Sequence, residues 1–455
     1  MTNSAKIGFF SRHPRGLYVL FFTEMWERFS FYGMRALLVL YMTQYLLFDP
    51  EKARAVFGYD GLESVLIQIF GPMNVQQMSS QIYGLYTGFV YLTPVFGGFI
   101  ADRFLGQNRS VYLGGILMTI GHFLMATESL FLVALVFLIF GNGFFKPNIS
   151  TQVGNLYPEG DSRRDSAFTL FYMGINLGAF FSPIVCGTLG QTVGWHYGFA
   201  AAGVGMILGL LVYHFGRRYV PQDSKAERQA KLKEASNTKM TADEWKRVGV
   251  ICLLCFLNIV FWGIYEQQGN TLQLWADERT NWNFFGVNIP STIYQSFNPG
   301  FIFIFAPILT IFWAWQFKRK KEPTSTMKMG IGCILCGLGF VIMIVAARAL
   351  GDEGRGSVMW LTATTWMFTM GELYLSPIGL SFVSKVAPRR IASMMMGVWF
   401  LSSFFGNYAS GLFGMLYSVM AKESFFAILA AAGVATGLIF VLLNKSIVRA
   451  VGKDA

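Results

Sequence analysis

Apolar residues gather into twelve stretches, each long enough to form a helix that crosses a bilayer. A spanning helix needs about 20 mostly apolar residues, and the 455-residue chain is 54% hydrophobic and only 13% charged. The pattern predicts an all-α membrane protein with twelve transmembrane helices near 17–47, 78–101, 109–127, 130–150, 165–190, 196–216, 246–274, 291–317, 327–349, 357–384, 389–418 and 424–445.

Basic residues are distributed unevenly between the two ends of these spans. With the N-terminus placed inside, 27 of the 36 Lys and Arg flank inner ends, six flank outer ends and three lie within spans. Cytoplasmic loops carry such an excess, so we expect both termini in the cytoplasm of a cell whose inner (plasma) membrane holds the chain. The same excess explains the net charge of +11 without a nucleic-acid partner.

A long charged segment divides the spans into two sets of six. It begins at Arg217 and leads to the predicted division into an N-terminal six-helix bundle (1–216), a cytoplasmic linker (217–245) and a C-terminal six-helix bundle (246–455). Residues 224–235, SKAERQAKLKEA, can form a basic amphipathic helix on the inner leaflet or a solvated linker. Two six-helix bundles suggest a shared midplane site that opens to each side in turn.

Seven charged side chains lie deep inside the predicted spans, away from the charged residues at the span ends. A charge at mid-bilayer costs about 2.5–3.5 kcal/mol on insertion scales, so such residues pair and serve a function. Glu24, Glu27, Arg28 and Arg35 recur at helical spacing with Phe31 and Tyr32 between them, which places them on one face of the first helix. That face is expected to line a water-filled cavity. The other three are Lys146, Glu266 and Glu372.

Other chemistry finds little support in the sequence. The pairs Cys252/Cys255 and Cys333/Cys336 have zinc-like spacing, but they lie in apolar runs without a nearby His or acid. No Walker motif indicates a nucleotide, and no nucleophile–base pair indicates an enzyme. We therefore expect no metal, no cofactor and no catalytic site.

Several motifs carry a resemblance to known transporters. GGFIADRFLGQNR (97–109) resembles the loop motif of the major facilitator superfamily, and EMWERFSFYG (24–33) resembles the E-x-x-E-R-F-x-Y-Y signature of proton-dependent oligopeptide transporters. FYMGINLGAFFSPIVCG, FWGIYEQQGNTL, GNGFFKPNIS and GELYLSPIG match further motifs of that family along the whole chain. Many bacterial members carry two extra helices between the halves, for which this linker has no room.

The resemblance implies a proton-coupled symporter that imports di- and tripeptides by alternating access. It implies proton coupling by Glu24, Glu27 and Arg28, and gating by the pairs Arg35–Glu266 and Lys146–Glu372 and by the loop residues Asp102 and Arg103. Burial favours the neutral form of a carboxyl in the first cluster and Arg28 favours its charged form, which suits a proton carrier. Substitution of Glu27 by Gln is expected to abolish gradient-driven accumulation.

The same side chains suit a zwitterionic substrate. Glu372 can hold the amino group of a peptide, while Arg35 and Lys146 hold its carboxylate. The expected substrate site also includes Tyr32, Tyr91, Asn176, Glu266, Asn298 and Trp399. Phe31 replaces a tyrosine of the signature, and Gly84 stands where animal relatives carry a histidine, so any coupling must rest on carboxylates. Two alternatives are a relative that moves another small zwitterion or anion, and a peptide sensor without flux.

Overall fold

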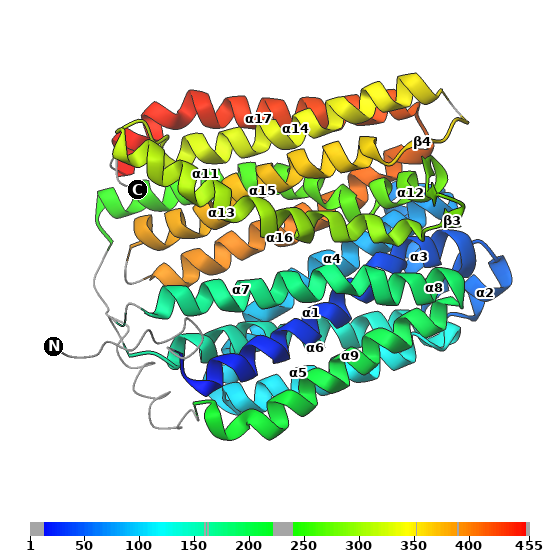
Figure 1. Ribbon diagram of the computed structural model, residues 1–455, viewed down its shortest axis with the longest axis horizontal. Coiled ribbons are helices and arrows are strands. Elements are labelled where there is room, and N and C mark those ends of the chain that lie inside the picture. Colours follow the sequence, from blue (N-terminus) through cyan, green and yellow to red (C-terminus); the bar gives the residue numbers. More distant parts are fainter. Residues whose placement is uncertain are drawn as a thin grey trace.

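The computed structural model describes residues 13–158, 161, 163–221, 240–351, 353–388 and 391–451. Within these residues twelve long helices follow one another (Figure 1). They are α1 (Arg15–Tyr41), α4 (Val75–Ile100), α5 (Gln107–Leu124), α6 (Phe131–Asn155), α7 (Arg163–Ser182), α9 (Trp195–Gly216), α11 (Ala242–Tyr265), α13 (Phe297–Lys318), α14 (Ser325–Leu350), α15 (Met359–Val386), α16 (Ala392–Gly414) and α17 (Lys422–Val451). The predicted amphipathic helix at 224–235 lies outside the described residues.

Eight of the helical stretches in the described chain are long and apolar enough to cross a membrane by length and composition alone. α1 is not among these eight, and it is the helix that carries Glu24, Glu27, Arg28 and Arg35. These four charged residues lower the mean hydropathy of α1, so hydropathy alone does not identify it as a span. All four are buried.

Hydrophobic side chains form two large cores, one in each half of the chain. The first joins residues between Leu17 and Val220, and the second is built almost wholly from residues between Ile251 and Ile447. In Figure 1 the N-terminal helices, blue to green, occupy the lower part of the view, and the C-terminal helices, yellow-green to red, occupy the upper part. The two sets meet where α4 packs against α16 and α7 packs against α13.

Several spans contain breaks that the apolar pattern does not predict. α11 ends in a 3₁₀ turn, Glu266–Gly269, before the short helix α12 (Thr271–Glu278), so the predicted span 246–274 is interrupted at Glu266. α1 continues into a π-helical turn, Met42–Leu46. α7 continues through a second such turn, Pro183–Gly187, into α8 (Thr188–Thr192).

Small elements cover the end of the molecule that lies opposite Arg15 and Val451, hereafter the far end (right in Figure 1). The helices α2 (Pro50–Ala55) and α3 (Tyr59–Phe70) fill the first loop there. Strand β1 (Thr280–Asn281) pairs in parallel with β4 (Gly356–Ser357), and β2 (Asn283–Phe284) pairs antiparallel with β3 (Val287–Asn288). Short helices and strands therefore form much of the described loops at this end.

Glycine allows the two halves to touch backbone to backbone. A Cβ placed on Gly84 of α4 would come within 2.8 Å of the Gly411 Cα on α16, which is closer than real Cβ contacts. Any side chain at position 84, including the histidine of animal relatives, would therefore force α4 and α16 apart.

Candidate substrate cavity and charged network

A polar cavity lies between the halves, at the level where α11 breaks. Its lining comes from α1, α4 and α7 in the N-terminal half and from the α11 break, the turn before α13, α13 itself and α15 in the C-terminal half. Seven residues predicted for the substrate site line it: Tyr32, Arg35, Tyr91, Asn176, Glu266, Asn298 and Glu372. Of the α1 face that was expected to line a cavity, Tyr32 and Arg35 do so, whereas Glu24, Glu27 and Arg28 are outside the lining.

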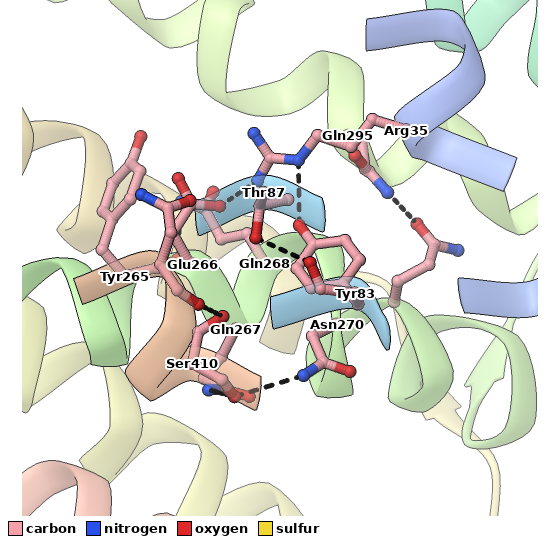
Figure 2. A network of polar contacts seen from close by, with 12 residues as sticks. Arg35, Tyr83, Thr87, Tyr265, Glu266, Gln267, Gln268, Asn270, Gln295 and Ser410 are labelled. Carbon is pink, nitrogen blue, oxygen red and sulfur yellow. Dashed lines mark hydrogen bonds and ion pairs between the residues drawn. The ribbon is translucent and has the colours of Figure 1, made fainter. Parts of the chain in front are cut away.

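Arg35 and Glu266 form a buried ion pair between the two halves, as the resemblance implied. The Nε of Arg35 also donates to the Tyr83 hydroxyl at 2.9 Å. Figure 2 shows the guanidinium of Arg35 between these two partners. Because the 3₁₀ turn begins at Glu266, the carboxylate projects from the point where the helix is interrupted. This pair fastens α1 to the α11 break.

Glu372 lies on the other side of the cavity and has a different set of partners. Its Oε2 accepts from the Tyr265 hydroxyl at 2.5 Å and from Asn298 Nδ2 at 3.1 Å. Both donors are neutral, and within the described residues no basic side chain forms an ion pair with Glu372. A carboxylate facing the cavity without a cation is suited to bind an ammonium group.

The second charged cluster is buried within the N-terminal half. Glu24, Glu27 and Arg28 are 1%, 0% and 3% exposed. Arg28 binds Glu27 through two hydrogen bonds, from Nε and from the NH2 nitrogen, the latter at 2.8 Å. Its Nε also lies 3.2 Å from Glu24 Oε1. Glu24 Oε2 is buried without a hydrogen-bond partner among the described residues, so one carboxyl oxygen of the cluster is open to a proton.

The structure does not bring every predicted partner together. Lys146 Nζ lies 4.5 Å from the centre of the Tyr91 ring, and within the described chain it forms no ion pair with Glu372. Trp399 is outside the cavity lining and packs against Gly379. Phe31 is also outside the lining, with its ring 5.2 Å from the Arg28 guanidinium carbon. The missing tyrosine hydroxyl therefore bears on the charged cluster rather than on the cavity.

The loop residues predicted to gate the protein lie at the end of α4. Asp102 and Arg103 belong to a π-helical turn, Ala101–Leu105, and the Arg103 guanidinium carbon lies 5.7 Å from the Phe99 ring centre. Gly97 lies so close to α6 that a Cβ there would be 2.0 Å from the Gly143 carbonyl oxygen. The glycines of this motif therefore allow α4 and α6 to pack closely just before the loop.

Sequence reasoning missed several residues that line the cavity: Tyr172, Trp262, Tyr265, Gln268 and Gln295. Each lies within four residues of a predicted member. Tyr172, for example, precedes Asn176 by one helical turn and accepts through its carbonyl oxygen from the Asn176 amide at 2.9 Å. These residues could have been found by including residues one to four positions from each predicted member, since residues three or four apart share a helix face.

Among the described residues no group of three His, Cys, Asp or Glu side chains is arranged to hold a metal ion. The cavity instead presents an arginine, two carboxylates, four tyrosine rings and several amides. This set can bind a small molecule by charge and hydrogen bonds.

Comparison with known proteins places the chain in a family. Residues 108–230 and 222–430 match the POT family. A di-/tripeptide transporter of Lactococcus lactis subsp. lactis is 35% identical over 99% of both chains, and a peptide transporter of Yersinia enterocolitica is 35% identical over 89% of this chain and 88% of the other.

Solved structures agree with this assignment. A crystal structure of a peptide transporter POT in complex with alafosfalin superposes with a TM-score of 0.82 at 33% identity, covering 98% of this chain and 97% of the other. A POT family transporter in complex with a thioalcohol-conjugated peptide gives a TM-score of 0.81 at 30% identity, covering 97% and 98%. The twelve-helix membrane fold expected from the sequence is confirmed, and the chain belongs to the POT family of proton-dependent oligopeptide transporters.

Proposed function

We propose that the protein imports di- and tripeptides together with protons. The observation that carries the proposal is the division of charge in the cavity. Glu372 faces it with partners that, among the described residues, are all neutral, and Arg35 faces it from the opposite half in an ion pair that substrate can compete for. A peptide with a free amino group and a free carboxylate matches both. Relatives named as di-/tripeptide and peptide transporters support the assignment.

The bonds described between the halves suggest how the cavity opens. Gln191 of α8 accepts from the backbone N–H of Thr292 at 3.0 Å, and Ser80 of α4 donates to Asn270 at 2.9 Å. These bonds lie at the far end. We propose that the far end is the outer face and is closed here, that both termini are cytoplasmic, and that the bundles 1–216 and 246–455 tilt about the cavity.

Uptake of labelled dialanine into proteoliposomes tests the function. We expect accumulation above equilibrium when an inward proton gradient is imposed, and equilibration only when it is absent, because the substrate is then coupled to no driving force. Binding of dialanine without any uptake would instead indicate a peptide sensor. Uptake that ignores the proton gradient would contradict proton coupling.

Asp277 of α12 forms an outer latch between the halves. Its Oδ2 accepts from Gln44 at 2.6 Å, and its Oδ1 accepts from Gln191 at 3.1 Å, so both donors come from the N-terminal half. Ser291 of its own half donates to Oδ1 at 2.5 Å. A hydrogen bond to a charged group contributes about 1.5–3 kcal/mol, so this latch contributes to keeping the far end closed.

Substitution of Asp277 by Ala is expected to raise the outward-open population about a hundredfold, since two bonds between the halves to a charged acceptor, each worth at least about 1.5 kcal/mol, are lost. The measurement is the rate at which a membrane-impermeant thiol reagent labels a cysteine placed at Ala179, in a background whose five native cysteines are replaced. Ala179 lines the cavity. Asp60→Ala, an exposed position on α3, is the matched control, and equal labelling of both variants would contradict the latch.

A further inference from the structure

Asn142 touches the charged cluster of α1 from a neighbouring helix. It is fully buried in α6. With its amide oxygen turned toward α1, that oxygen accepts from the Arg28 NH2 nitrogen at 3.2 Å, while the amide nitrogen donates to the Val90 carbonyl oxygen at 3.3 Å. Asn142 therefore connects α1, α4 and α6 at the guanidinium of Arg28.

The two glycines beside Asn142 explain how it reaches this place. A Cβ on Gly143 would lie 2.7 Å from Thr93 Cβ on α4, and a Cβ on Gly141 would lie 2.5 Å from Met118 Cγ on α5. Successive residues of a helix point about 100° apart, so α6 is pressed against α4 and α5 through its glycines. Asn142 lies between these two glycines in sequence, and its side chain points toward α1.

Arg28 distributes its donors among acceptors of different charge. Both carboxylate oxygens of Glu27 accept hydrogen bonds from Arg28, whereas Glu24 contacts Arg28 through Oε1. The other charged or titratable groups that interact with the cluster are Lys146 of α6, Tyr32 of α1, and Tyr86 and Tyr91 of α4. Asn142 is the neutral acceptor in this set, so it holds the NH2 nitrogen without adding a negative charge.

We propose that Asn142 is a positioning residue for proton coupling. Its amide oxygen accepts from the Arg28 guanidinium, which also binds both oxygens of Glu27. Glu24 is then bound to Arg28 by a single contact, so it can leave this ion pair when it takes up a proton. This inference rests on the proposed function. Asn142 is expected to set the pH of half-maximal uptake without taking part in substrate binding.

Two isosteric variants test the inference because they act in opposite senses. Asn142→Asp adds a carboxylate that competes for Arg28 and repels the glutamates, so a glutamate is protonated more readily and the pH of half-maximal uptake rises. Asn142→Leu removes the neutral acceptor, so Arg28 turns fully to the glutamates and that pH falls. We expect shifts of about one pH unit each, equivalent to about 1.4 kcal/mol. Exchange of labelled for unlabelled dialanine at fixed pH should persist.

The control is Asn148→Leu, a buried asparagine on the same helix whose amide, within the part of the chain that the structure describes, bonds only to the Phe144 carbonyl at 2.7 Å. It should leave the pH profile unchanged, and thermal melting of all three variants shows that they fold. A shift of both Asn142 variants in the same direction, or no shift in either, would overturn the role of Asn142. Absence of proton-driven uptake in the unmodified protein would instead overturn the proposed function.

Discussion

Proteoliposomes that contain Glu27→Gln are expected to lose gradient-driven accumulation of dialanine and to keep exchange. One charge that moves through 100 mV supplies about 2.3 kcal/mol, enough for about 50-fold accumulation. With Gln at position 27, the bidentate bonds between Glu27 and Arg28 are gone. Glu24 then becomes the sole carboxylate partner of Arg28 in the cluster and stays ionised, so no proton is carried. Accumulation should fall from about 50-fold to none.

Glu24→Gln separates the two carboxyls. It leaves the Arg28–Glu27 pair intact but removes the buried Oε2 that has no partner within the described residues. We expect the same loss of accumulation, with exchange retained. Glu51→Gln, at an exposed position of α2, is the matched control and should accumulate dialanine normally. Full accumulation by the Glu27 variant would exclude this cluster from coupling, and loss of exchange would show a folding or binding defect instead.

Helical spacing predicted that the charges of α1 lie together and away from lipid, and all four are buried, but it did not separate Arg35 in the cavity lining from the cluster outside it. The charges of α1 had to avoid lipid, and an α-helix places positions 24, 27, 28 and 35 along one side. The ion pair Arg35–Glu266 was implied by the family motifs and is confirmed. Spacing within one helix could not place Asn142 against Arg28, because that contact depends on how closely the glycines of α6 approach α4 and α5.

Contacts between the halves were harder to predict, since they depend on which face of the cavity is open. Lys146 and Glu372 were expected to pair, and in the described structure they do not. A charge pattern gives compatible partners, but it does not tell in which conformation they meet. The interruption at Glu266 was also hidden, because the apolar run continues through it to residue 274. Trp399 carried no charge to restrict its position, and it packs against Gly379 instead of entering the cavity.

Acetylation of the amino group of dialanine is expected to weaken its binding at least tenfold, which corresponds to about 1.4 kcal/mol. The physical reason is the environment of Glu372. Its Oε2 has the Tyr265 hydroxyl and the Asn298 amide as partners, and neither neutralises the carboxylate. A peptide ammonium would supply that charge, whereas an acetamide cannot. Competition with labelled dialanine for uptake gives both apparent affinities.

Measuring both peptides with Glu372→Gln tests whether Glu372 causes the loss of affinity on acetylation. In that variant the free and the acetylated peptide should bind about equally, because the glutamine amide attracts both to a similar degree. Amidation of the peptide carboxylate should remain unfavourable, since Arg35 still lies across the cavity. Glu423→Gln, which alters a surface ion pair with Arg348, should keep the full acetylation penalty. Equal affinity of the unmodified protein for both peptides would remove the amino-group role from Glu372, and an undiminished penalty in Glu372→Gln would assign that role to another acid such as Glu266.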